Sequence, residues 1–199
     1  MEKRDTRGLL KCLLVIFGFF VVSNVFARPL GGDFKLEDPA GHPVRLSEFH
    51  GKVVLLAFGY THCPDICPTE LLQFAQLLRE LGTDSDRVQP IFISVDPVRD
   101  TPEVLIQYVN SFSRKIIPLT GTQSDLMKVA RQYGTYFRYV KAGAGSSGYT
   151  VDHSGNTYVI DARGKLGAIY PFGTPLEEIE RSVRSLLPNK HPSNPQPEQ

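Results

Sequence analysis

The stretch Val53-Val54-Leu55-Leu56-Ala57-Phe58-Gly59 runs directly into Tyr60-Thr61-His62-Cys63-Pro64-Asp65-Ile66-Cys67-Pro68. The first run is continuously apolar, which predicts a central strand buried on both faces of a sheet. Residues 69–81 then carry apolar side chains at helical spacing, and Gly82 marks the end of the predicted helix. Two thiols therefore stand four residues apart where a strand gives way to a helix.

The rest of the chain alternates strand and helix signals around this unit. Such alternation predicts an α/β sandwich with parallel central strands, and a dithiol between the first central strand and the first long helix is the arrangement of thioredoxin. We therefore predict a thioredoxin-like α/β fold, with a central mixed sheet flanked by helices and an N-terminal hairpin. The other expected elements are a hairpin of 34–38 and 44–46, strands at 88–95 and 116–120, a hairpin of 156–160 and 166–170, a helix capped by Thr101 with Pro102 in its first position, a helix capped by Ser124 that ends near Gly134, a helix at 175–187 and a flexible loop at 141–148.

The bulk composition fits one globular domain with appendages. The chain has 199 residues, of which 41% are hydrophobic, and this is enough for a substantial core. Its formal net charge is only +1, and it has no basic run, so the sequence does not favour nucleic acid as a partner.

The two termini read as appendages of a domain at 28–188. Residues 1–27 combine a basic start with an apolar stretch that ends at Ala27, which predicts a signal peptide or a retained membrane anchor. The proline-rich tail at 189–199 lacks core-forming residues and is expected to be disordered. Export implies an oxidising compartment, where Cys63 and Cys67 must be either oxidised or protected by a metal.

The spacing of the two cysteines leaves more than one chemistry open. Cβ atoms four residues apart on a helix lie ~5–6 Å from each other, whereas a disulfide needs ~3.8 Å. A metal bonded to both sulfurs spans the wider gap more easily, so the spacing favours metal binding without excluding a redox pair or two inert thiols. Pro68 suits the start of a helix, and a helix N-terminus near Cys67 favours a thiolate there.

A site with two thiolates needs a third ligand, and His153 is the candidate. It follows the glycine-rich segment, and neutral imidazole suits copper in both oxidation states. Asp152 either orients His153 from outside the ligand set or caps a turn. His62 is adjacent to Cys63 but would point elsewhere in an extended chain, so we assign it an outer or structural role.

Four motifs of the chain resemble the Sco/SenC family of copper-binding, thioredoxin-fold proteins that assist assembly of the copper A centre of cytochrome c oxidase. The resemblance runs from about residue 31 to 187, with the motifs in the family's order. It implies that Cys63, Cys67 and His153 bind copper, as Cu(I) or Cu(II), and that Asp96 and Arg99 lie near the site. The motifs are Gly59-Tyr60-Thr61-His62-Cys63-Pro64-Asp65-Ile66-Cys67-Pro68, Ser94-Val95-Asp96-Pro97-Val98-Arg99-Asp100-Thr101-Pro102, Leu119-Thr120-Gly121-Thr122 and Val151-Asp152-His153-Ser154.

The resemblance also implies partners and a location. A copper chaperone of this kind would deliver its ion to the copper A subunit of cytochrome c oxidase. It would exchange copper or electrons with other periplasmic copper carriers or thiol reductants, on the periplasmic side of a bacterial inner membrane. The alternative function is a thiol–disulfide oxidoreductase that keeps the cysteines of the acceptor reduced. A peroxidase is a poor fit, because the Thr-x-x-Cys setting of such enzymes is missing around Cys67.

Overall fold

The computed structural model describes residues 29–141 and 148–188. The predicted signal or anchor, the predicted tail and most of the predicted loop at 141–148 lie outside these residues. Within the two described ranges, no helix combines the length and the apolar character that crossing a membrane requires.

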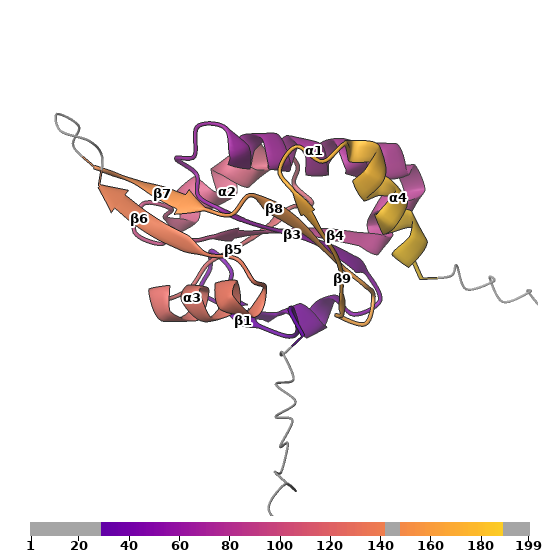
Figure 1. Ribbon diagram of the computed structural model, residues 1–199, viewed down its shortest axis with the longest axis horizontal. Coiled ribbons are helices and arrows are strands. Elements are labelled where there is room, and N and C mark those ends of the chain that lie inside the picture. The colour runs from indigo at the N-terminus through magenta and orange to yellow at the C-terminus, as the bar shows by residue number, and fades with distance from the viewer. Residues whose placement is uncertain (1–28, 142–147, 189–199) are drawn as a thin grey trace, which may run out of the picture.

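A five-stranded mixed sheet forms the centre of the domain, in the order β5-β4-β3-β8-β9 (Figure 1). Three strands, β3, β4 and β5, are parallel to one another, while β8 is antiparallel to both of its neighbours. Every residue of β3 is buried, as its continuous apolar run predicts. The strands are β3 (Val53–Gly59), β4 (Val88–Ser94), β5 (Ile117–Leu119), β8 (Asn156–Ile160) and β9 (Leu166–Pro171).

Helices cover both faces of this sheet. Figure 1 shows α1, α2 and α4 on one side, with α3 and the N-terminal hairpin on the other. The short hairpin pairs β1 (Lys35–Glu37) with β2 (Pro43–Arg45), as predicted. This arrangement confirms the thioredoxin-like prediction. The helices are α1 (Ile66–Leu81), α2 (Pro102–Asn110), α3 (Gln123–Gln132) and α4 (Leu176–Leu186), with short 3₁₀ turns η1 (Leu46–Phe49) and η2 (Gly82–Arg87).

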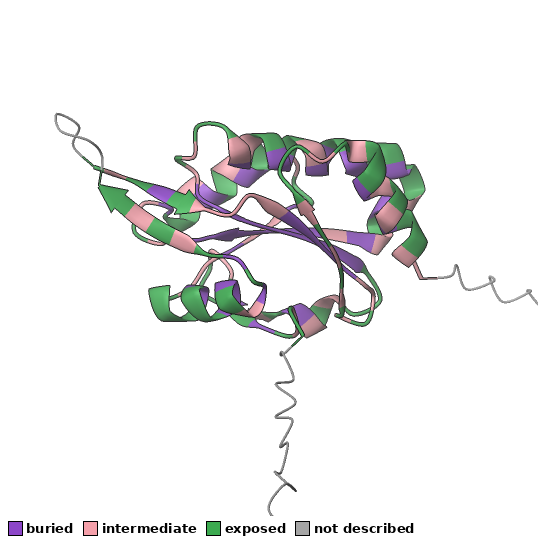
Figure 2. Ribbon diagram, viewed as in Figure 1, coloured by how far each residue is buried: buried purple, intermediate pink, exposed green. Residues whose placement is uncertain are grey.

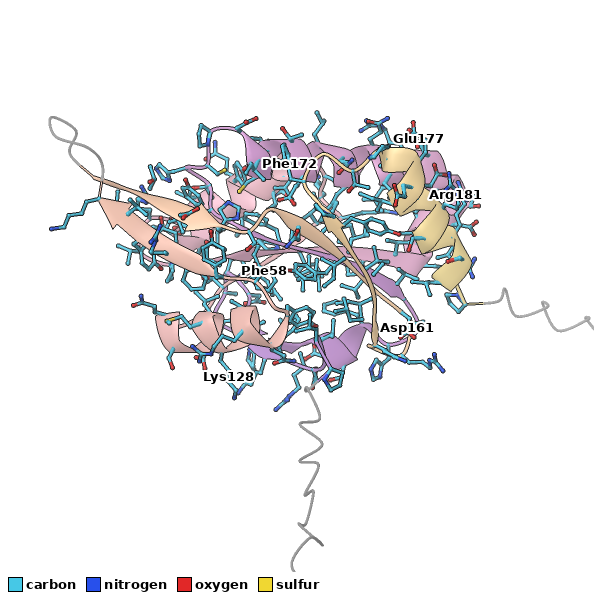
Figure 3. The ribbon with its side chains drawn as sticks, viewed as in Figure 1. Phe58, Lys128, Asp161, Phe172, Glu177 and Arg181 are labelled. Atoms are coloured by element: carbon cyan, nitrogen blue, oxygen red, sulfur yellow. The ribbon has the colours of Figure 1, made fainter. Side chains whose placement is uncertain are left out.

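The core lies between the sheet and its two helical layers. Buried residues concentrate on the central strands and on the inward stripes of the helices (Figure 2). Phe58, labelled in Figure 3, lies in this interior and packs edge-on against Tyr158. Tyr133 joins the same aromatic group and donates its hydroxyl to the carbonyl of Gly32. The core therefore holds the end of β3, from which the cysteine motif begins, in a fixed position.

The hairpin predicted at 156–160 and 166–170 is confirmed as β8 and β9, but a further hairpin was not predicted from the sequence. β6 (Phe137–Lys141) pairs with β7 (Tyr149–His153) in a separate two-stranded sheet that extends away from the central sheet, beyond the ends of its strands (Figure 1). The predicted loop at 141–148 therefore connects two strands, and His153 lies at the end of one of them.

Two helix starts also differ from the prediction. α1 begins at Ile66, before the predicted residue 69, because Pro68 occupies the first turn, where a backbone N–H has no partner within the helix. The N-cap of α3 is Thr122, not Ser124, since the Thr122 hydroxyl accepts the N–H of Asp125 at 3.2 Å. The predicted cap of α2 is confirmed: Thr101 accepts the N–H of Val104.

Candidate metal centre

The two cysteines lie at the N-terminus of α1. Cys67 is the second residue of the helix and is fully buried, while Cys63 lies in the preceding loop and is half-buried. Both are free cysteines. The backbone N–H of Cys67 points at Cys63 Sγ, at 3.5 Å. The helix N-terminus thus provides a hydrogen-bond donor that favours the thiolate form of Cys63.

At Gly59, the backbone at the end of β3 lies close to the buried thiol of Cys67. A Cβ atom on Gly59 would lie 2.4 Å from Cys67 Sγ and 2.8 Å from Cε2 of Phe92. Such separations are shorter than van der Waals contact, so only glycine allows the strand to pass this close to the sulfur. The backbone of β3 therefore forms one wall of the thiol pocket.

His153 brings an imidazole to the same place from β7. Its Nε2 lies 3.4 Å from Cys67 Sγ, and this nitrogen and the two sulfurs all lie within 4.8 Å of one another. Its other ring nitrogen, Nδ1, lies 3.3 Å from the carbonyl oxygen of Ser154. The ring of Tyr60 packs edge-on against the imidazole, with 5.8 Å between centroids. A hydrogen bond at Nδ1 leaves Nε2 available to face the sulfurs.

The three groups perturb one another's protonation. A hydrogen bond from Cys67 lowers the pKa of Cys63, and the same bond, together with burial, raises the pKa of Cys67. Burial by itself would lower the pKa of His153, but its interaction with the Cys63 thiolate raises it. The first proton therefore leaves the pair from the more exposed sulfur, Cys63.

A carboxyl group is buried close to the centre. Glu70 lies one turn after Cys67 on the inward stripe of α1 and is only 2% exposed. Among the described residues, neither of its side-chain oxygens has a hydrogen-bond partner. Desolvation raises the pKa of Glu70 from 4.5 to about 7, against the attraction of His153. This group is therefore close to neutral in the folded protein at slightly acid pH.

The loop between β4 and α2 contacts both halves of the centre. Asp100 is buried and accepts hydrogen bonds from the N–H and the hydroxyl of Thr61, at 3.0 and 2.7 Å. Asp96 is also fully buried, and it accepts from the Tyr149 hydroxyl at 2.6 Å and from Arg99 Nε. The loop thus joins the start of the cysteine motif to the hairpin that carries His153.

The structure brings together Cys63, Cys67 and His153. The residues predicted to lie around these three have separate positions and contacts. Asp96 lies near the group and acts on the hairpin through Tyr149. His62 has a mostly exposed ring whose Nδ1 lies 3.1 Å from the Thr61 hydroxyl. Asp152 pairs with Arg138 across the hairpin, on the exposed face of β7. The carbonyl of Ser154, and not Asp152, faces the free ring nitrogen of His153.

Three neighbours of the centre were missed in the sequence. Glu70 carried a usable signal, because a charged residue three positions after Cys67 falls on the apolar stripe of the predicted helix. Tyr149 and Asp100 gave no such signal, since their roles depend on contacts over 53 and 39 residues of sequence.

The donor set fits a soft metal ion. Thiolate sulfur selects Cu(I) and Zn, and imidazole suits copper in either oxidation state. Two sulfurs and one nitrogen within 4.8 Å can close around a single ion with small side-chain movements. Fold and site together define a thioredoxin-like protein with a candidate Cys₂His metal centre at the start of its first helix.

Comparison with known proteins identifies the family to which this chain belongs. The SCO1/SenC family model matches residues 23–188, and the chain belongs to this family. It is 40% identical over 166 residues to Protein SCO2, mitochondrial, of Saccharomyces cerevisiae, covering 81% of this chain and 55% of that relative. It is also 38% identical over 152 residues to an SCO2-like protein of Rickettsia felis, covering 76% and 74% of the two chains. This chain therefore spans only about half the length of the yeast relative.

Solved structures agree with the fold and include copper-bound proteins. Bradyrhizobium japonicum ScoI with copper bound has a TM-score of 0.70 and 37% identity, covering 79% of this chain and 99% of that chain. Arabidopsis thaliana ScoI with copper bound has a TM-score of 0.71 and 35% identity, covering 78% and 99%. BsSco, described as a Sco-family cytochrome c oxidase assembly protein with a disulfide switch, has a TM-score of 0.62 and 27% identity, covering 80% and 95%.

Proposed function

We propose that this protein is a copper chaperone that binds one copper ion through Cys63, Cys67 and His153. The observation that carries the proposal is the convergence of the two sulfurs and the imidazole nitrogen within 4.8 Å. The copper-bound relatives from Bradyrhizobium japonicum and Arabidopsis thaliana support it. The acceptor we propose is the copper A centre of cytochrome c oxidase, in keeping with the description of BsSco as an oxidase assembly protein.

The geometry suits an ion that is passed on. Two thiolates alone hold Cu(I) well, and the imidazole adds a ligand that Cu(II) also favours. A three-coordinate ion leaves room for a ligand of the acceptor to bind before a ligand of the chaperone dissociates. Cys63 is the more exposed sulfur, so we assign it to the side from which the acceptor approaches.

A second function, thiol–disulfide exchange, is favoured by the asymmetry of the two cysteines. Cys63 is half-buried with a lowered pKa, whereas Cys67 is buried with a raised pKa. In this reaction the Cys63 thiolate attacks a disulfide of the acceptor, forming a mixed disulfide and releasing one acceptor thiolate. Cys67 then loses its proton and displaces the second acceptor thiolate, so that the acceptor is reduced and Cys63–Cys67 is oxidised. The two functions are compatible, because copper loads onto the reduced pair.

We place the domain on the outer side of a bacterial inner membrane, either exported or held by its N-terminal segment. The basic and apolar pattern of residues 1–27 supports this proposal. So do the resemblances to SCO2-like proteins of Rickettsia and to a SCO1/SenC lipoprotein of Bacillus anthracis. Mass spectrometry of the protein isolated from membranes distinguishes cleavage after Ala27 from a retained anchor.

The His153→Ala variant tests which function prevails. We expect it to lose oxidase assembly in copper-poor cells, because the third ligand is missing, while thiol exchange in vitro continues at a near-normal rate. The matched control is His50→Ala, which removes an exposed histidine outside the three-residue group. Full oxidase assembly by His153→Ala in copper-poor cells would overturn the chaperone function in favour of the reductase.

A further inference from the structure

The hairpin that carries His153 needs side-chain anchors to hold its position. Among the strands of the described residues, β6 and β7 pair only with each other, in a sheet separate from the central one. A two-stranded hairpin is at best marginally stable by itself in water. What fixes this one against the domain therefore also fixes the distance between the imidazole and the two sulfurs.

Burial alternates along β7, and this alternation identifies the face of the strand that packs against the domain. Tyr149, Val151 and His153 are partly or fully buried, while Thr150 and Asp152 between them are exposed. Side chains two and four positions apart share one face of a strand. Tyr149 and His153 thus lie on the same inward face, at opposite ends of a segment about 14 Å long at ~3.4 Å per residue.

Arg99 is the main contact to the Tyr149 end. Its Nη1 donates to the backbone carbonyl of Tyr149 at 2.7 Å, and its guanidinium stacks on the Tyr149 ring, 3.8 Å from the centroid. Its Nε pairs with the buried carboxylate of Asp96, which also accepts the Tyr149 hydroxyl at 2.6 Å. One tyrosine is therefore held at its backbone, its ring and its hydroxyl by two residues of a single loop.

A second contact leads from Arg99 to the imidazole. The guanidinium also lies 5.5 Å from the centroid of the Tyr60 ring, and Tyr60 packs edge-on against His153. The same loop holds the start of the cysteine motif, through the hydrogen bonds that Thr61 donates to Asp100. Both ligand-bearing segments therefore meet at the loop between β4 and α2.

We propose that Arg99 and Tyr149 form a clamp that positions His153 against the two thiols, so that Arg99 is a positioning residue for the copper(II) state of the centre. This inference rests on the proposed copper function. Because Cu(I) is satisfied by two thiolates, the clamp acts mainly on Cu(II), for which the imidazole matters more. Arg99 contacts no ligand atom in the structure and works through the hairpin and Tyr60.

The test compares the full-length protein with its Arg99→Gln, Tyr149→Phe and Arg138→Gln variants. Tyr149→Phe removes one hydroxyl and keeps the ring under the guanidinium, so it remains informative if Arg99→Gln folds poorly. Arg138→Gln is the matched control, because it removes an arginine of the same hairpin whose ion pair with Asp152 is exposed. Each protein is measured by amide hydrogen exchange without copper, by Cu(II) absorption and electron paramagnetic resonance, and by Cu(I) competition with a chelator.

We expect Arg99→Gln and Tyr149→Phe to speed exchange in β6 and β7 and to weaken Cu(II) binding by about 10–100-fold, the range found for groups that orient metal ligands. The nitrogen coupling of the Cu(II) signal should weaken, Cu(I) affinity should stay nearly constant, and Arg138→Gln should match the wild type.

Two results would overturn the clamp while the copper function stands. One is unchanged hairpin exchange in both variants, and the other is faster exchange with an unchanged Cu(II) signal and affinity. If the wild-type protein binds no copper, the proposed function fails and the positioning role fails with it. The exchange data, which need no copper, then show whether Arg99 holds the hairpin at all.

Discussion

Nε2 of His153 lies 3.4 Å from Sγ of Cys67, although 86 residues separate them in the chain. The sulfur belongs to the first turn of α1, at the centre of the domain, and the imidazole to a hairpin at its edge. Their meeting depends on the close approach of β3 at Gly59 and on the contacts of Arg99 with Tyr149.

Replacing either cysteine with serine should abolish tight copper binding. A hydroxyl is a hard, weakly acidic ligand that cannot replace a thiolate for Cu(I). We expect each variant to lose more than about 100-fold in Cu(I) affinity, beyond the loss caused by removing an orienting group. Metal analysis of reduced protein, together with a thiol count, checks this. Full copper stoichiometry in the variant that carries both serines would show that copper binds elsewhere.

Replacing His153 with alanine should separate the two oxidation states. We expect Cu(II) affinity to fall by about 100-fold or more, because the imidazole nitrogen of the proposed ligand set is lost, while Cu(I) affinity falls far less. Chelator competition under reducing and oxidising conditions measures both, with His50→Ala as the control. Unchanged Cu(II) absorption in His153→Ala would mean that the third ligand is another residue.

Replacing Gly59 with alanine should displace the buried thiol. The new methyl group would lie 2.4 Å from Cys67 Sγ, so either the strand or the first turn of α1 must shift. We expect a loss of about 1–3 kcal/mol in the free energy of unfolding, typical of overpacking, together with weaker copper binding. Denaturant titration and copper competition measure the two effects.

Gly121→Ala is the matched control for this substitution. Its new methyl group would meet the end of the Leu36 side chain at 3.2 Å, where a small side-chain movement gives room, and Cβ of Asp125 at an ordinary contact distance of 3.9 Å. Copper affinity should stay at the wild-type value in this variant. Equal losses of copper affinity in both alanine variants would argue against a specific role for the space at Gly59.

Replacing Glu70 with glutamine should make stability less dependent on pH. Because folding raises the pKa of Glu70 from 4.5 to about 7, the native state binds the proton more tightly than the unfolded state. The stability of the wild-type protein therefore falls as pH rises from 4.5 to about 7, and the loss is complete above that range. At 1.36 kcal/mol per pKa unit, the loss amounts to about 3 kcal/mol.

A glutamine at position 70 does not titrate, so the Glu70→Gln variant should not lose stability in this way as the pH rises. Unfolding of the reduced, copper-free proteins is measured across this pH range. Relative to the wild type, the free energy of unfolding of Glu70→Gln should rise by about 3 kcal/mol between low and neutral pH. A difference that does not depend on pH adds to this change. Glu80→Gln, an exposed change on the same helix, should run parallel to the wild type. If the free energy of unfolding of Glu70→Gln also changes with pH in parallel with that of the wild type, the Glu70 carboxyl is not desolvated as described.

The sequence predicted the parts of this structure that local patterns encode. The buried run of β3, the helix after it and the Thr101 cap each follow from the identity and spacing of neighbouring residues. The β6–β7 hairpin was missed because its position depends on distant contacts, such as the bond from the Tyr139 hydroxyl to the carbonyl of Val95. The sequence still predicts His153 as a candidate ligand, from its imidazole, its place after the glycine-rich segment and the family resemblance.

The most direct test of the copper centre is X-ray absorption at the copper edge of the reduced full-length protein loaded with one equivalent of copper. We predict two sulfur neighbours and one imidazole nitrogen, with the imidazole contribution lost in His153→Ala and both sulfurs lost when Cys63 and Cys67 are replaced by serine. A spectrum with only nitrogen and oxygen neighbours, or one that persists unchanged in the serine variant, would contradict it.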